Sequence, residues 1–174
     1  MEEGNKLGLF EATVLPHLSA PYNLARWLLR DNSAAEDVVQ ESYLRALRYF
    51  SGYHGGDSRA WLLTIVRNTS YNWLQQNRSR ELMNPMEDAE ALTAGEANPE
   101  AVLQQRIDHD LLRQALNELP IEFREILILR EMEGLSYKEI AAVADLPIGT
   151  VMSRLARSRA RLQERLAGRL NQEI

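Results

Sequence analysis

The feature that most constrains the fold is the spacing of the apolar residues, which recur every three or four positions on both sides of an acidic middle segment. This spacing gathers apolar side chains on one face of an α-helix, whereas a half-buried strand requires alternation with a period of two. No stretch alternates convincingly in that way. We therefore predict an all-α fold, and 174 residues suffice for a real apolar core in one or two domains.

The charged residues divide the chain into three segments. Residues 1–80 carry 9 basic and 8 acidic groups, residues 81–108 carry 1 and 7, and residues 109–174 carry 10 and 10. The middle segment also contains prolines and a glycine and offers little periodic apolar surface, which is typical of a flexible, solvated linker. We therefore predict two small helical domains, 1–80 and 108–174, joined by an acidic linker over 81–107.

Capping signals and glycines position the helices of the first domain. The run Ser33–Glu36 has the spacing of a capping box, which predicts a helix that begins at Ala34. Its apolar face consists of residues three or four apart, namely Val39, Tyr43, Leu47 and Phe50. A glycine-containing loop follows, and the next helix is expected over about 59–76. Two shorter helices separated by a proline are expected earlier, over 9–18 and 23–30.

The second domain has the spacing of a helix-turn-helix motif. Pro120 and Gly134 mark the start and the end of one helix, and a second capping box at Ser136 begins a short helix of about 137–144. A tight turn at 145–147 then leads into a last, longer helix. A short helix, a turn of three or four residues and a longer helix form the helix-turn-helix arrangement.

The last helix carries a cationic face. Its arginines are spaced three or four apart at Arg154, Arg157, Arg161 and Arg165. Guanidinium groups contact phosphates and can read guanine in the major groove, while small or polar residues let the leading end of a helix approach the bases. That leading end holds Gly149, Thr150, Met152 and Ser153. The alternative is an exposed face that offsets the helix macrodipole, but the capped helix and turn directly before it favour DNA binding.

The helix after the glycine loop offers a second polar face. Hydrogen-bonding, cationic and aromatic side chains share it, at Thr64, Arg67, Asn68, Tyr71, Gln75 and Arg78. This mixture suits a nucleic-acid strand, because amides and arginines reach phosphates or bases and aromatic rings can stack. An ordinary amphipathic helix with a polar outer face is the alternative, and these residues alone favour that alternative.

An acidic patch lies on the helix of the first capping box. Its members face away from the apolar stripe and are Asp37, Gln40, Glu41 and Leu44. Acids in the first turn of a helix are stabilised by the macrodipole, which is the default explanation. A docking surface for a basic partner is the alternative, and an exposed leucine among polar groups leans slightly toward it.

The sequence offers no motif of an enzyme, a metal site or a cofactor site. There is no cysteine, the three histidines are far apart, and no phosphate loop, nucleotide fingerprint or nucleophile elbow occurs. We expect no enzymatic activity, no metal and no cofactor. The start lacks the features of a signal peptide and the longest apolar run has five residues, so we expect neither export nor membrane insertion, and a cytoplasmic location.

Two ordered stretches resemble the extracytoplasmic-function (ECF) class of bacterial sigma factors, the small promoter-specificity subunits of RNA polymerase. The first stretch comprises residues 35–47, 59–68 and 73–74, and the second comprises residues 116–120, 134–141 and 149–155. The resemblance covers most of residues 8–80 and 108–168. It implies a two-domain helical transcription initiation factor.

The resemblance also implies roles for the first domain. The helix that carries Asp37, Gln40 and Glu41, with Leu44 in the same patch, would dock on the clamp helices of the largest polymerase subunit. The loop over 51–58 and the polar face of the next helix would engage the minus-ten element and hold its non-template strand open. The residues expected on that face are Arg67, Asn68, Tyr71 and Asn72.

The second domain would bind the minus-thirty-five element, while its other side packs on the flap of the second-largest subunit. The DNA contacts expected on its last helix are Thr150, Met152, Ser153, Arg154, Arg157 and Arg161. Two positions depart from the family pattern, because Met152 stands where a lysine or arginine is common and Asp145 stands where glycine is common. An anti-sigma partner is typical of the family.

Two other functions remain compatible with the residues. A stand-alone helix-turn-helix regulator would bind operator DNA tightly without polymerase. A helical adaptor would use its acidic linker and helix faces only to bind proteins.

Overall fold

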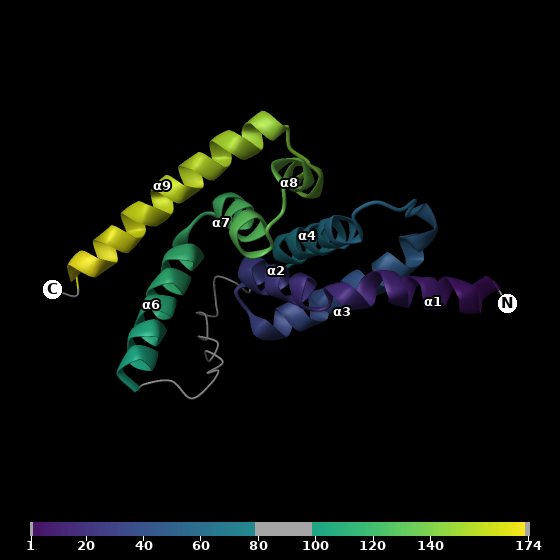
Figure 1. Cartoon of the computed structure of the whole chain (residues 1–174), viewed down its shortest axis with the longest axis horizontal. Coiled ribbons are helices and arrows are strands. Elements are labelled where there is room, and N and C mark those ends of the chain that lie inside the picture. Colours follow the sequence, from purple (N-terminus) through teal and green to yellow (C-terminus); the bar gives the residue numbers. More distant parts are fainter. Residues whose placement is uncertain (1, 79–98, 173–174) are drawn as a thin grey trace.

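The computed structural model of the chain describes residues 2–78 and 99–172, and the regular elements there are all helical (Figure 1). The first half contains α1 (Glu2–Val14), α2 (Ser19–Leu29), α3 (Asn32–Tyr49) and α4 (Ser58–Gln76), with 3-10 turns at Leu15–His17 and Phe50–Gly52. The second half contains α6 (Pro99–Glu118), α7 (Ile121–Leu127), a π-helical turn (Ile128–Met132), α8 (Tyr137–Ala144) and α9 (Ile148–Gln172). The predicted all-α fold is confirmed.

Helix α3 begins two residues earlier than the sequence analysis predicted. Its N-cap is Asp31, whose carboxylate accepts hydrogen bonds from the backbone N–H groups of Ser33 at 2.9 Å and Ala34 at 3.1 Å. The predicted capping box at Ser33 was therefore wrong. Asp and Ser cap helices about equally well. Asp31 has the extended backbone of an N-cap residue (φ −148°, ψ 120°), so the helix begins after Asp31 and not after Ser33.

Replacing Asp31 with alanine should lower the free energy of unfolding by about 1 kcal/mol, because two N–H groups of the first turn lose their acceptor. The matched variant Ser33→Ala should change it by less than about 0.3 kcal/mol, since Ser33 lies within the helix and caps nothing. Urea unfolding followed by circular dichroism measures both values. Equal losses in the two variants would contradict this assignment of the cap.

The buried face of α3 is also rotated relative to the predicted apolar stripe. Ala35, Val38 and Ala46 are buried, whereas Val39, Tyr43 and Leu47 are only half-buried at its edge. Small alanine side chains allow neighbouring helices to approach closely, which is consistent with their place on the buried face of α3.

Two proline positions explain further differences from the prediction. Pro21 does not separate two helices, because it lies in the first turn of α2, where backbone N–H groups have no intrahelical partner. Pro99 is the first residue of α6, a position that favours proline, so residues 99–107 are helical. The rest of the predicted linker, up to residue 98, lies outside the described residues, and the proposed domain boundaries stay a prediction.

The helix-turn-helix motif has the geometry that the sequence indicated. Ser136 and Glu139 form the reciprocal capping box at 3.1 Å and 3.0 Å, and α8 has the predicted bounds. Asp145 ends α8 in the left-handed region (φ 55°, ψ 55°), and Gly134 has φ 66° at the end of the preceding helical segment. Asp145 thus adopts the turn conformation that favours glycine, as aspartate does more readily than most residues.

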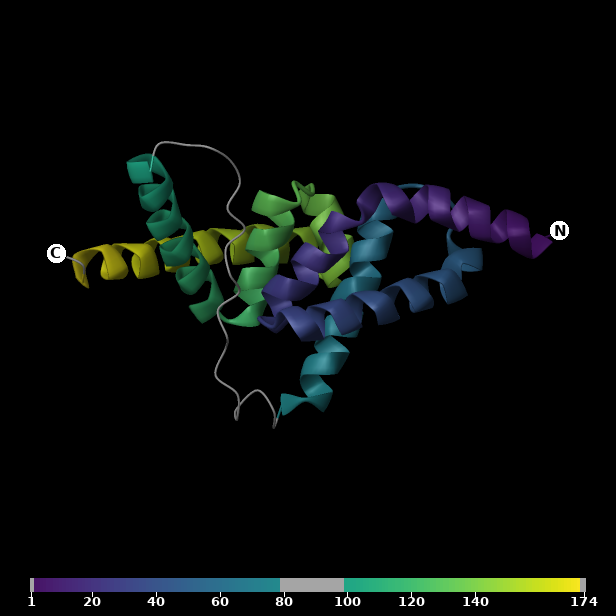
Figure 2. The same cartoon turned by 90° about the horizontal axis from the view of Figure 1, so that it is seen from below.

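The two halves share one apolar core. Leu28 and Leu63 of the first half belong to the same buried cluster as Ile126 and Ile140 of the second. Helix α2 packs against α7 and α4 packs against α8, while α1 and α9 extend toward opposite ends of the molecule (Figures 1 and 2). Within the described ranges, no helix combines the length and apolarity needed to span a bilayer.

Candidate nucleic-acid and polymerase interfaces

The leading end of α9 presents most of the predicted DNA-contacting residues to solvent. Val151 and Leu155 are buried against the rest of the second half and so fix the orientation of the helix. Facing away from them are the exposed side chains of Met152, Ser153 and Arg157 and the half-buried side chains of Thr150 and Arg154. In the described part of the chain, neither Arg154 nor Arg157 forms an ion pair with an acidic side chain. Their positive charges are therefore available to a phosphate backbone.

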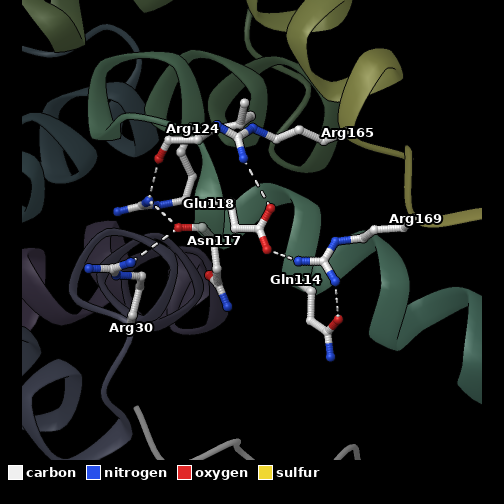
Figure 3. A network of polar contacts seen from close by, with 8 residues as sticks. Arg30, Gln114, Asn117, Glu118, Arg124, Arg165 and Arg169 are labelled. Carbon is white, nitrogen blue, oxygen red and sulfur yellow. Dashed lines mark hydrogen bonds and ion pairs between the residues drawn. The ribbon is translucent and has the colours of Figure 1, made fainter. Parts of the chain in front are cut away.

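The other arginines of α9 are engaged within the protein. Arg159 pairs with Glu131 at 2.6 Å, and Arg165 and Arg169 both pair with Glu118 of α6 (Figure 3). The hydrogen bonds that the Arg159 guanidinium donates to the Glu131 carboxylate raise the pKa of Arg159. These contacts link α9 to α6 and to the π-helical turn. The arginines of α9 thus form two groups: those that pair with an acidic side chain of the protein, and those that have no such partner in the described part of the chain.

Arg161 differs from the residues that precede it on the predicted face. Its guanidinium lies 4.5 Å from the centre of the Phe123 ring, which is a cation–π contact with α7. The side chain is still exposed. A role of Arg161 in DNA binding stays a prediction.

The second half of the chain contacts two residues of the polar face of α4 and leaves two others exposed. Asn68 and Asn72 are exposed, whereas Arg67 and Tyr71 contact Glu125 of α7. The Arg67 Nε donates to Glu125 Oε1 at 2.6 Å, and the Tyr71 hydroxyl donates to Glu125 Oε2 at 2.8 Å. The guanidinium of Arg67 also lies 4.1 Å from the centre of the Tyr71 ring.

The contact with Glu125 changes the titration of both α4 residues. Burial raises the pKa of Tyr71, and the nearby charge of Glu125 raises it further, so the hydroxyl remains a donor at neutral pH. Burial alone would lower the pKa of Arg67, but the hydrogen bond and charge of Glu125 outweigh burial, and the net pKa is raised. Both groups therefore stay protonated, and able to donate to an anion, over a wider pH range than usual.

The acidic patch occupies the outer face of α3. Asp37, Gln40 and Glu41 are exposed, and Leu44 is 67% exposed. Arg45 pairs with Glu41 at 2.6 Å, an exposed contact that contributes little to stability. The four predicted polymerase-docking residues therefore form one accessible surface with an apolar member at its end.

Comparison with known proteins matches both halves of the chain to one family. The model named Sigma-70 region 2 matches residues 13–80, and the model named Sigma-70, region 4 matches residues 109–162. An ECF RNA polymerase sigma-E factor of Salmonella typhimurium is 34% identical over 138 residues, which cover 75% of this chain and 72% of the relative. The chain belongs to the ECF sigma factors.

Two further relatives agree with this membership. The ECF RNA polymerase sigma factor SigE of Mycolicibacterium smegmatis is 36% identical over 160 residues, which cover 91% of the chain but 62% of the relative. The sigma factor RpoE of Bartonella quintana, solved in complex with the anti-sigma factor NepR, has a TM-score of 0.74 and 31% identity, with 91% of this chain and 96% of that chain covered. The family expected from the sequence is thus confirmed.

The loop between α3 and α4 of this ECF sigma factor rests on an aromatic cluster. Phe50 stacks on Tyr53 at 5.8 Å, and Tyr53 lies 5.0 Å from Trp61, measured between ring centres. The Tyr53 hydroxyl donates to the carbonyl of Gly56 at 3.0 Å, and Gly55 and Gly56 both have φ 91°. The glycines allow the backbone to turn in a way that other residues rarely adopt, so the predicted minus-ten loop has a defined shape.

Sequence reasoning missed Glu125 and Arg124, which connect the second half to the first. Glu125 is 1% exposed and Arg124 is 3% exposed. The signal was present, because both charges precede the apolar run Ile126–Leu129 on one short helix. A charged residue at a buried position needs a partner, and that requirement could have marked α7 as a polar interface.

Proposed function

We propose that this sigma factor directs RNA polymerase core enzyme to specific promoters and assists promoter opening, without catalysing a reaction itself. One observation carries the proposal, namely that a region 2 with an exposed acidic face on α3 and a region 4 with an exposed leading end of α9 occur on one chain. The first serves binding to polymerase and the minus-ten element, and the second serves binding to the minus-thirty-five element. The protein would act in the cytoplasm, together with the polymerase.

The proposed polymerase contacts lie in both halves. The outer face of α3, with Asp37, Gln40, Glu41 and Leu44, would meet the clamp helices of the largest subunit, while the second half would pack on the flap of the second-largest subunit. Support for the first contact comes from the exposure of all four side chains. Polar residues around one exposed leucine are typical of a protein-docking surface that faces solvent before its partner binds.

The proposed promoter contacts divide between α4 and α9. The exposed amides of Asn68 and Asn72 and the loop above the aromatic cluster would engage the minus-ten strand, together with Arg67 and Tyr71 once these are free of Glu125. The minus-thirty-five contacts would be made by the leading end of α9: Thr150, Met152, Ser153, Arg154, Arg157 and, farther along, Arg161. Met152, Ser153, Arg157 and Arg161 are exposed and Thr150 and Arg154 are half-buried, on the last helix of a helix-turn-helix, which supports this assignment.

We further propose that an anti-sigma protein regulates the chain. The similar sigma factor RpoE was solved with an anti-sigma factor, and its alignment covers 91% of this chain.

The experiment that tests the polymerase part of the proposal is co-elution of the purified chain with bacterial core enzyme in gel filtration. A stand-alone regulator would instead remain separate from core and bind duplex DNA tightly by itself.

The substitution Leu44→Ala should weaken binding to core enzyme about tenfold, since burying a leucine at an interface is worth about 1.5 kcal/mol or more. The free energy of unfolding should stay unchanged, because Leu44 is 67% exposed in the free protein. A fluorescence titration of labelled chain with core measures the affinity. The control is Leu103→Ala on α6, where the leucine is 60% exposed but lies outside the docking surface; a tenfold loss there as well would contradict the assignment.

A further inference from the structure

The contact between α4 and α7 is centred on a carboxylate that solvent hardly reaches. Glu125 is 1% exposed, and each of its oxygens accepts a hydrogen bond from α4, one from Arg67 at 2.6 Å and one from Tyr71 at 2.8 Å. Both donors belong to the face proposed to hold the minus-ten strand. The second half therefore covers part of the nucleic-acid surface of the first half.

The two donors form a site for an anionic group with more than one oxygen. A guanidinium and a hydroxyl can bind a phosphate with the same hydrogen bonds that they give to a carboxylate. The ring of Tyr71 also supports the Arg67 guanidinium from 4.1 Å, so the pair is organised before any ligand arrives. Arg67 and Tyr71 thus have the chemistry of a phosphate site, now filled by Glu125.

We propose that Arg67 and Tyr71 bind a backbone phosphate of single-stranded DNA, and that Glu125 occupies this phosphate site from within, so that strand binding and contact with α7 exclude each other. The inference deepens the proposed function and rests on it. It assigns Glu125 as an internal competitor and not as a residue that touches DNA. Binding of a strand then requires α7 to leave α4.

The surroundings of the pair suit the approach of a strand. A cavity of about 960 Å³ borders Tyr71 and is lined on the α4 side by Asn72, Gln75 and Arg78. The lining also includes Arg165 of α9, Glu118, which pairs with Arg165, and the exposed Glu122. Amide and cationic groups thus extend from the pair along α4, which is the pattern of a backbone-tracking groove.

Further polar contacts join the two halves besides those of Glu125. The Asn23 amide of α2 donates to Glu133 at 2.9 Å, and Arg30 donates to the carbonyl of Asn117 at 3.1 Å (Figure 3). Charged and amide groups regain water when such contacts open, which offsets part of the cost of opening. Opening exposes the shared apolar core as well as these polar contacts, so binding of a strand has to offset that cost.

The affinity for a strand can be measured without polymerase. The probe is a fluorescent single-stranded DNA of mixed sequence, titrated at low salt with the full chain, and the variant is Glu125→Gln, which removes the charge at nearly constant shape. We expect the variant to bind the probe about fivefold more tightly, because the competent fraction of molecules rises. The matched control is Glu11→Gln on α1, which removes the same charge from an exposed residue that does not line the cavity and should change the affinity less than about twofold.

The double variant Arg67→Gln with Glu125→Gln should lose the gain, since the phosphate site itself is then damaged. Equal gains in the Glu125 and Glu11 variants would show that only net charge matters and would overturn the proposal. Retention of the gain in the double variant would overturn it as well.

A second measurement uses the unaltered contact and does not depend on any Glu125 variant folding. The chain has no cysteine, so spin labels can be placed on Glu36→Cys in α3 and Gln163→Cys in α9, both of which are exposed. Saturating probe DNA should shift the distance distribution between the labels to longer values. An unchanged distribution with the probe bound would contradict the exclusion, whereas a failure of the proposed polymerase function would leave this result untouched.

Discussion

The substitution Arg124→Ala is expected to lower the free energy of unfolding by about 3 kcal/mol or more, because several buried carbonyls would lose their donor together. The guanidinium, on a residue that is 3% exposed, donates to the carbonyls of Trp27 at 2.7 Å, Leu28 at 3.2 Å and Leu119 at 2.9 Å. The first two carbonyls belong to the last turn of α2, where no intrahelical donor is available. Arg124 thus caps a helix of the first half from a helix of the second.

Urea unfolding of the full chain measures this loss, and two further variants identify its cause. Arg124→Met keeps most of the side-chain volume but removes the donors, so it should be nearly as unstable as Arg124→Ala. Arg157→Ala removes an exposed arginine and should stay within about 0.5 kcal/mol of the unaltered chain. A stability of Arg124→Ala close to that of Arg157→Ala would contradict the role of Arg124 as a cap between the halves.

The second large effect is expected on DNA binding by α9. Replacing Arg154 and Arg157 together with glutamine should weaken binding of polymerase holoenzyme to a promoter by about 100-fold, since each arginine contact to a base or phosphate is worth about 1–3 kcal/mol. The dependence of binding on salt should also become shallower, because fewer counterions are released. Filter binding at several salt concentrations measures both changes.

The control for this prediction is the double variant Arg159→Gln with Arg165→Gln, which removes the same number of charges from the same helix. Those two arginines pair with Glu131 and Glu118 within the protein, so their charges already have acidic partners. Promoter affinity should fall less than about fivefold, with a small loss of stability from the exposed pairs. Equal losses in both double variants would mean that only the total charge of α9 counts, contrary to the division seen in the structure.

Local features of the fold could be predicted where one signal dominated. The capping box at Ser136, the left-handed turn at Asp145 and the end at Gly134 have no strong competitor nearby, and the helix-turn-helix came out with the predicted bounds. At α3, Asp31 and Ser33 are both good caps two residues apart. Propensity alone does not choose between them, because the choice depends on which residues the helix must bury.

The contacts between the halves could not be predicted in the same way. Arg67 and Glu125 are 58 positions apart in the chain, and nothing periodic in the sequence links them. The same limit applies to the arginines of α9, since the spacing that placed them on one face did not reveal that Glu118 and Glu131 engage some of them. The spacing of apolar and charged residues predicts which residues share one face of a helix, but the residues that this face contacts depend on tertiary packing.

Promoter-directed initiation by this chain can be measured by run-off transcription with purified bacterial core polymerase on a library of genomic promoter fragments, with and without the chain, followed by sequencing of the transcript starts. We expect discrete new starts that depend on the chain and share two upstream sequence motifs, one for each half of the protein. The absence of such starts, while the isolated chain binds specific duplex DNA tightly, would contradict the account and indicate a stand-alone regulator.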